Sequence, residues 1–107
     1  MSGFDKRKEG FESRFAHNEN LEFKAAARRN KMLGLWLAKL MNMSAQEAEA
    51  YAKQVIISDF EEAGDEDVFR KLRADADEAG LTLSDHQIRS KMAQFMEQAR
   101  EQVKSEG

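Results

Sequence analysis

Histidines and carboxylates are the side chains of this sequence that could bind a metal ion or move a proton. His17 and His86 are the only histidines, and neither has a second ligand three or four residues away. Asp75 and Asp77 resemble the start of a calcium-binding loop. The fifth position of such a loop is Ala79 here and the twelfth is His86, where calcium needs oxygen ligands. We therefore expect no metal site.

A dense acidic segment is the next candidate for chemistry. Its carboxylates are those of Asp59, Glu61, Glu62, Asp65, Glu66 and Asp67. They flank a predicted turn between two helices, and no apolar pocket marks a position where a carboxyl pKa would shift toward acid–base work. We interpret the segment as a solvated acidic face. The sequence also has no cysteine, no phosphate-binding glycine loop and no nucleophile motif, so we expect no catalytic residues and no enzyme activity.

A basic stripe precedes the acidic segment. Its members are Lys24, Arg28 and Lys31, with Arg29 beside them. Four cations on two helical turns could hold a few phosphates of a nucleic acid. In the alternative interpretation, Lys24, Arg28 and Arg29 lie near Asp59, Glu61 and Glu62 and pair with them, because the start of one antiparallel helix lies beside the end of the next. The net charge of −3 favours the second interpretation, since an acidic chain repels a phosphate backbone.

Three phenylalanines near the start of the chain form an aromatic ridge. At about 100° per residue, Phe4, Phe11 and Phe15 fall within roughly 40° of one helical face, and charged residues surround them. Gly10 lowers the stability of a helix here by about 1 kcal/mol. An amphipathic but marginal segment either packs on its own protein or folds into the groove of a partner. We expect a flexible arm over residues 1–18.

The rest of the sequence favours helices, because it lacks proline and is rich in Ala, Glu, Lys, Arg, Leu and Met. Four helices are predicted. The first covers residues 20–42 and the third covers residues 65–79. The second begins at a capping box of Ser44 and Glu47, and the fourth begins at a capping box of Ser84 and Gln87. Gly64 and Gly80 fit positions just past helix ends. Short loops imply antiparallel neighbours, so we expect an all-α, antiparallel four-helix bundle over residues 19–107.

Trp36 lies in the apolar run of the first of these helices. We expect it in the core, with stacking on a ligand as the alternative. No apolar run is long enough to span a membrane, and no secretion signal is visible, so we expect a soluble cytoplasmic protein.

Several longer motifs resemble one family. They are Phe4-Asp5 with Arg7, residues 15–18 (FAHN), 23–31 (FKAAARRNK), 33–36 (LGLW), 59–68 (DFEEAGDEDV), Arg70-Lys71, Ile88-Arg89 and Met92. The chain is similar in these runs, and over nearly its whole length, to the zeta subunit, an ATPase inhibitor of the F-type ATP synthase of alphaproteobacteria and formerly a domain of unknown function.

The resemblance implies a monomeric inhibitor whose arm enters the catalytic head of the synthase, near the alpha, beta and gamma subunits, at the cytoplasmic face of the inner membrane. The arm residues that it marks as partner contacts are Phe4, Asp5, Arg7, Phe11, Arg14 and Phe15. It also implies weak binding of ADP or ATP without a required cofactor. For that site, charge and stacking single out Arg28, Arg29 and Trp36. No nucleic acid and no membrane insertion are expected.

Two other functions stay open on the sequence. One is a helical module that binds nucleic acid through the basic stripe, and the other is a nucleotide-sensing bundle.

Overall fold

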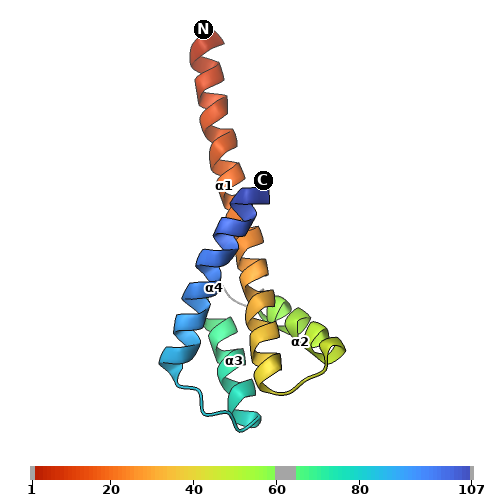
Figure 1. The fold of residues 1–107 in the computed structure, drawn as a ribbon. Helices are drawn as coiled ribbons and strands as arrows, with labels where there is room; N and C mark the ends of the chain where they lie inside the picture. The colour runs from red at the N-terminus through yellow and green to blue at the C-terminus, as the bar shows by residue number, and fades with distance from the viewer. Residues whose placement is uncertain (1, 60–64, 107) are drawn as a thin grey trace.

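The computed structural model describes the backbone of residues 2–59 and 65–106, and the side chains from residue 21 onward within those ranges. Four helices account for most of them (Figure 1). They are α1 (Ser2–Leu40), α2 (Ala45–Ser58), α3 (Glu66–Glu78) and α4 (Asp85–Glu106). The described residues contain no strand, so the predicted all-α, four-helix fold is confirmed.

Helix α1 is longer than the sequence suggested. We expected a separate arm and a helix that begins near Asn20, whereas one continuous helix of 39 residues begins at Ser2. No proline interrupts this stretch, and the cost of about 1 kcal/mol at Gly10 is too small to end a helix by itself. The flexibility of residues 1–18 stays a prediction, and the side chains of the six predicted partner contacts lie outside the described residues.

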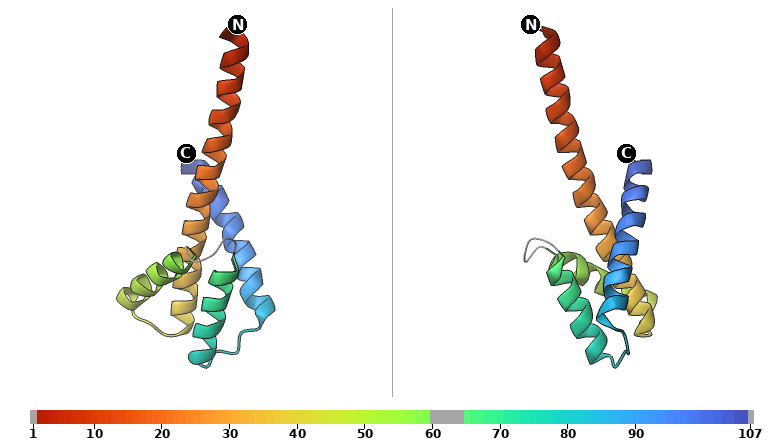
Figure 2. Two further views of the ribbon diagram at one scale, coloured as in Figure 1. Left: turned by 180° about the vertical axis from the view of Figure 1, so that it is seen from behind. Right: turned by 90° about the vertical axis from the view of Figure 1, so that its left-hand side faces the viewer.

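The N-terminal half of α1 extends beyond the other helices, as the views in Figures 1 and 2 agree. Helix α4 runs antiparallel to α1 and ends beside it, while α3 runs antiparallel to α4 and α2 crosses α1 obliquely. The longest dimension of the molecule is 64 Å. Since a helix rises about 1.5 Å per residue, the 39 residues of α1 account for nearly all of that length.

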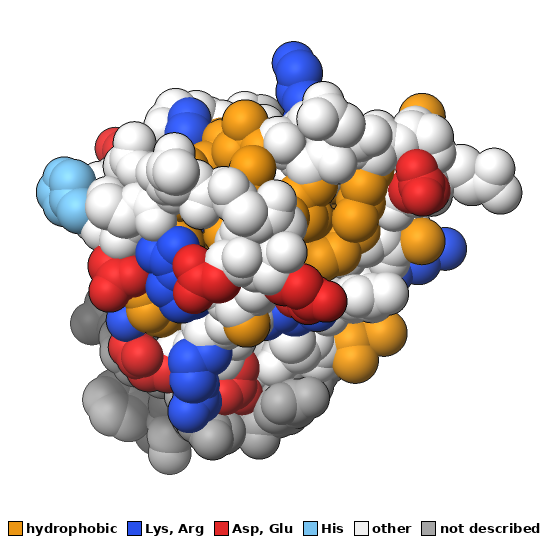
Figure 3. Space-filling model, turned by 90° about the horizontal axis from the view of Figure 1, so that it is seen from below, with side chains coloured by type: hydrophobic (Ala, Val, Ile, Leu, Met, Phe, Trp, Pro, Cys, Tyr) orange, Lys and Arg blue, Asp and Glu red, His pale blue; other side chains and the backbone are white. Residues whose placement is uncertain are grey.

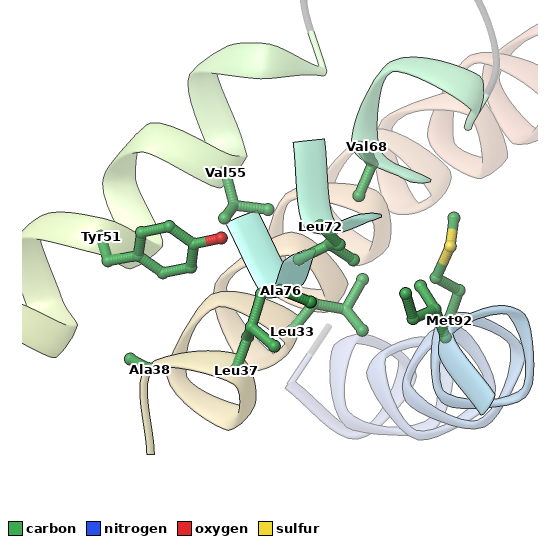
Figure 4. Close-up of a cluster of buried hydrophobic side chains, with 10 residues drawn as sticks. Leu33, Leu37, Ala38, Tyr51, Val55, Val68, Leu72, Ala76 and Met92 are labelled. Atoms are coloured by element: carbon green, nitrogen blue, oxygen red, sulfur yellow. The ribbon is translucent and has the colours of Figure 1, made fainter. Parts of the chain in front are cut away.

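One core joins all four helices below the projecting part of α1. Figure 4 shows side chains of α1, α2, α3 and α4 directed toward one another, among them Leu33, Val55, Leu72 and Met92. The first three of these are fully buried. Trp36 packs against this core from a partly buried position, as the core interpretation of the sequence predicted.

The backbones of α1 and α2 lie very close together at Gly34. A Cβ atom added to Gly34 would lie 2.6 Å from the Cα atom of Ala52, which is shorter than real contacts of this kind. The two backbones can cross at this distance only because Gly34 has no side chain. No pattern in the sequence predicted this contact.

Helix ends follow local rules. Glu47 accepts from the amide of Ser44 at 2.9 Å and Ser44 accepts from the amide of Glu47 at 3.1 Å, so the first predicted capping box is confirmed. Ser84 and Gln87 form the second. Gly80 has a φ of +74° just after α3, as expected for a helix end.

One helix end differs from its predicted position. The predicted helix extended to Asn42, but α1 ends at Leu40, and Asn42 adopts a φ of 61° in the loop to α2. Asparagine is the residue that most often replaces glycine in this left-handed conformation.

Candidate functional site

The part of α1 that leaves the main core is held by the end of α4. Ala25 of α1 contacts Ala99 and Val103 of α4 in a second, smaller apolar cluster, and all three side chains are buried. Leu21, Met32 and Met96 pack around them. Because two of the central side chains are alanines, the two helices can lie close together at this point.

Two ion pairs join the same segments. The guanidinium group of Arg100 donates to the carboxylate of Glu22 at 2.9 Å. Arg28 donates to both carboxylate oxygens of Glu106, with a distance of 2.7 Å to Oε1. This hydrogen bond lowers the pKa of Glu106 below its ordinary value and raises the pKa of Arg28. All four side chains are at least partly exposed.

The neighbouring Arg29 points into the protein instead. Its side chain is only 2% exposed, and its Nη1 donates to Asp65 Oδ1 at 2.8 Å, just before α3. Nη2 lies 3.9 Å from Asp59 Oδ2 at the end of α2, too far for a hydrogen bond. Nε donates to Asn30 Oδ1 at 3.0 Å. Arg29 therefore ties α1 to the ends of both α2 and α3.

These contacts identify partners for two residues of the basic stripe, Arg28 and Arg29. The predicted pairing with Asp59 is confirmed for Arg29 but wrong for Arg28, which binds Glu106 on α4. Successive residues of a helix point about 100° apart, so Arg28 and Arg29 face different neighbours. Glu61 and Glu62 lie outside the described residues. Lys24 and Lys31 are exposed. Since two of its four cations are engaged by carboxylates, the stripe does not form one open phosphate-binding surface.

The three residues singled out for a nucleotide all lie on α1 and have different neighbours. Arg28 and Arg29 hold carboxylates, and Trp36 lies about two turns further along α1, with Lys91 Nζ at 6.0 Å from its ring centroid. A hollow of about 510 Å³ between α1 and α4 is lined by other residues. They are Leu21, Glu22, Glu97, Arg100, Glu101 and Lys104.

Two donors in this region are buried and lack a hydrogen-bond partner among the described residues. They are Nη2 of Arg29 and Nδ2 of Asn30. Asp67, at the start of α3, is also buried, and only its Oδ1 is bound, by Arg70. The solvated face expected of the acidic segment is therefore wrong for Asp67. Asp67 is buried because it lies on the face of α3 that is turned toward the body.

The opposite end of the body holds a cluster that the sequence analysis missed. The hydroxyl of Tyr51 in α2 donates to Asp75 Oδ2 in α3 at 2.6 Å, and Lys71 lies 3.1 Å from the same oxygen. Burial, with the bond to Asp75, raises the pKa of Tyr51. The spacing of Lys71 and Asp75, four residues apart, was a visible signal. The cluster joins α2 to α3.

Figure 3 shows this end of the molecule, where apolar side chains gather between charged ones. The loops after α1 and α3 bring partly buried apolar side chains here, namely Met41, Met43, Leu81 and Leu83. A shallow hollow of about 260 Å³ lies beside Met41 and Met43.

Of the two histidines, only His86 has a described side chain. His86 is exposed in the first turn of α4, 3.5 Å from the hydroxyl of Ser90, and the side chain of His17 lies outside the described residues. Within the described ranges, no three His, Cys, Asp or Glu side chains are grouped as metal ligands would be. No helix in those ranges has the length and apolar character needed to cross a membrane.

Comparison with known proteins gives a matching family and similar solved structures. The family model described as ATPase inhibitor subunit zeta matches residues 1–102. A solved structure, described as a solution NMR structure of the protein, is 44% identical in sequence, covers 81% of this chain and 99% of its own, and superposes with a TM-score of 0.71. No curated protein matches the chain.

Proposed function

Because the chain belongs to the ATPase inhibitor subunit zeta family, we propose that it inhibits ATP hydrolysis by inserting the start of α1 into the catalytic head of an F-type ATP synthase. The observation that supports this mechanism is the projection of α1 beyond the body, which leaves a long helix available to a partner (Figure 1). The proposed partners are the alpha, beta and gamma subunits, and the protein acts as a monomer at the cytoplasmic face of the membrane.

The aromatic ridge supplies the apolar contact of this proposal. Burying Phe4, Phe11 and Phe15 at about 25 cal/mol per Å² contributes several kcal/mol. Ordering a flexible arm of some fifteen residues costs about 1–2 kcal/mol per residue, which is larger. Hydrogen bonds with the partner, and charge contacts of Asp5, Arg7 and Arg14, therefore have to contribute as well. These charges also fix the register of the helix in its cleft.

Inhibition in this scheme is mechanical. The arm fits a cleft between subunits that changes shape as the central stalk turns, so only one conformation of the head accepts it. Binding holds the head in that conformation and stops rotation, without occupying the position of the substrate.

Deletion of residues 1–17 tests the arm. We expect the shortened protein to keep the helices of the body and its cooperative unfolding, because the main core begins near residue 33. It should not inhibit ATP hydrolysis by the purified head at any concentration that inhibits with the full chain. As a matched control, Phe4, Phe11 and Phe15 are replaced together by alanine, which keeps the length of the arm but removes the ridge. Inhibition by the shortened protein would show that the arm is not the inhibitory element.

Binding of ADP or ATP by the body is a second proposal, favoured by the buried donors of Arg29 and Asn30 that lack a partner among the described residues. Titration with ADP should shift the NMR signals of the Arg29 guanidinium and the Trp36 indole, and AMP serves as the control. Unchanged signals at millimolar ADP would contradict nucleotide binding, but they would not bear on the proposal that the arm inhibits ATP hydrolysis.

A further inference from the structure

We propose that the last two turns of α4 hold residues 21–29 of α1 as a preformed helical start for the arm. Glu22, Arg28, Arg100 and Glu106 are then positioning residues of the inhibitor, although none of them belongs to the arm. This inference rests on the proposed function, because it concerns how the arm is presented to its partner. We call the contact between these two segments the α1–α4 clamp.

The clamp has an apolar centre separate from the main core. Ala25 is 1% exposed, and Ala99 and Val103 are 0% and 3% exposed. These side chains are small, so the apolar area that they bury is small compared with that of the main core. The polar contacts beside them therefore make up a large share of the interaction.

The two ion pairs lie on either side of that centre. At about 100° per residue, Glu22 and Arg28 are displaced in opposite directions from Ala25 around α1. Glu22 binds Arg100 and Arg28 binds Glu106, so α4 is attached to both flanks of α1, about one turn before Ala25 and about one turn after it. This arrangement resists both rotation of α1 about its axis and its separation from α4.

A held segment lowers the cost of ordering the arm. Nucleating a new helix is unfavourable by a factor on the order of 10³, whereas extending an existing helix is nearly neutral for each residue. If residues 21–29 are already helical, the arm forms by extension toward Ser2 when it meets its partner. If the clamp opens, helix α1 frays back to the main core, and binding then has to order those residues as well.

A charge swap at one ion pair tests the clamp. The variant Arg100→Glu places two carboxylates together, and the double variant Glu22→Arg/Arg100→Glu restores the pair in reverse. Two quantities are measured on the full chain: amide hydrogen exchange of residues 21–29, and the concentration that half-inhibits ATP hydrolysis by the purified head. We expect Arg100→Glu to speed the exchange and to raise the half-inhibitory concentration by about three- to ten-fold. The double variant should recover most of both effects.

Arg89→Glu is the matched control. Arg89 also lies on α4 and forms an exposed pair between helices, but its partners, Glu66 at 2.8 Å and the ring of Phe69, belong to α3. This variant should leave both the exchange of residues 21–29 and the inhibition unchanged.

The outcomes separate the clamp from the arm. Faster exchange in Arg100→Glu with unchanged inhibition would overturn the positioning role, and so would unchanged exchange. In either case the proposed function would still stand if deletion of residues 1–17 abolished inhibition. Failure of the unmodified full chain to inhibit the head would instead overturn the proposed function.

Discussion

Arg29 carries a charged group into an interior that is otherwise mostly apolar. A buried guanidinium group is tolerated only where carboxylates and amide oxygens surround it, and here Asp65, Asp59 and Asn30 do so. The adjacent Arg28 lies on the surface and binds α4 instead. Two residues of the same type and of consecutive number thus stabilise different pairs of helices.

Replacement of Arg29 by methionine tests this role. Methionine keeps much of the volume but leaves the two aspartates and Asn30 without their partner, so we expect the free energy of unfolding to fall by about 2–3 kcal/mol. Urea denaturation followed by circular dichroism measures it. Arg28→Met, at a surface position, should cost clearly less. Equal losses in the two variants would contradict the structural distinction between them.

The pair of Arg28 and Glu106 predicts a dependence of stability on pH. The folded pKa of Glu106 lies below the ordinary value of 4.5, because Arg28 donates hydrogen bonds to its ionised carboxylate. Its contribution to stability is therefore complete above about pH 5 and is lost as the pH falls through the folded pKa. Glu106→Gln should accordingly melt at a lower temperature than the unmodified chain at pH 7. The difference should shrink toward zero on acidification, and a constant difference between pH 7 and pH 2 would contradict it.

At the scale of helices, the features governed by neighbouring residues could be predicted, and those governed by distant residues could not. Both capping boxes and the helix end at Gly80 follow from local sequence and are present. The binding of Arg28 to Glu106 depends on how α1 and α4 cross, which the helical period alone does not determine. The start of α1 was misplaced because a marginal segment can still extend an adjoining helix.

For the candidate site, the family could be predicted from the sequence, but the surroundings of individual side chains could not. The family and its zeta-type motifs were visible in the sequence, and the matched family model confirms them. The partner contacts in the arm stay predictions, since an interface with another protein leaves no mark on the isolated chain. The burial of Asp67 was missed because a carboxylate in the first turn of a helix is usually solvated.

The crossing of α1 and α2 predicts the effect of Gly34→Ala. Alanine favours a helix by up to about 1 kcal/mol over glycine, but its Cβ would meet backbone atoms of Ala52 at 2.6 Å. We expect the clash to dominate and to lower the free energy of unfolding by about 1–3 kcal/mol, measured by urea denaturation. Ala52→Gly should not restore the loss, because the nearest atom is the Cα of that residue, which glycine keeps.

Gly80→Ala provides the contrast, since no atom lies within 4 Å of an added Cβ there and only the φ of +74° opposes it. That variant should cost about 1 kcal/mol. If Gly34→Ala were instead more stable than the unmodified chain, α1 and α2 could move apart without a loss of stability.

At the scale of the whole molecule, the length of α1 allows the state of the arm to be measured directly. The chain has no cysteine, so spin labels can be attached at cysteines introduced in place of Ser2 and Lys39. On a continuous helix the two positions lie about 55 Å apart. We expect a broad distribution of distances in the isolated protein and a narrow one near 55 Å when the synthase head is bound. A narrow distribution in both states would contradict a flexible arm.

The contacts between α1 and α4 also constrain the order in which the protein assembles during synthesis. Glu22 and Arg100 are 78 residues apart in the chain, as are Arg28 and Glu106. Contacts this distant form late, because the intervening chain must first be brought together. A ribosome-bound chain that lacks residues 100–106 already has the aromatic ridge outside the exit tunnel. It still lacks Arg100 and Glu106, which bind Glu22 and Arg28 of α1. Full inhibitory strength would therefore arise only once residues 100–106 have joined the fold, after the arm and the main core are already in place.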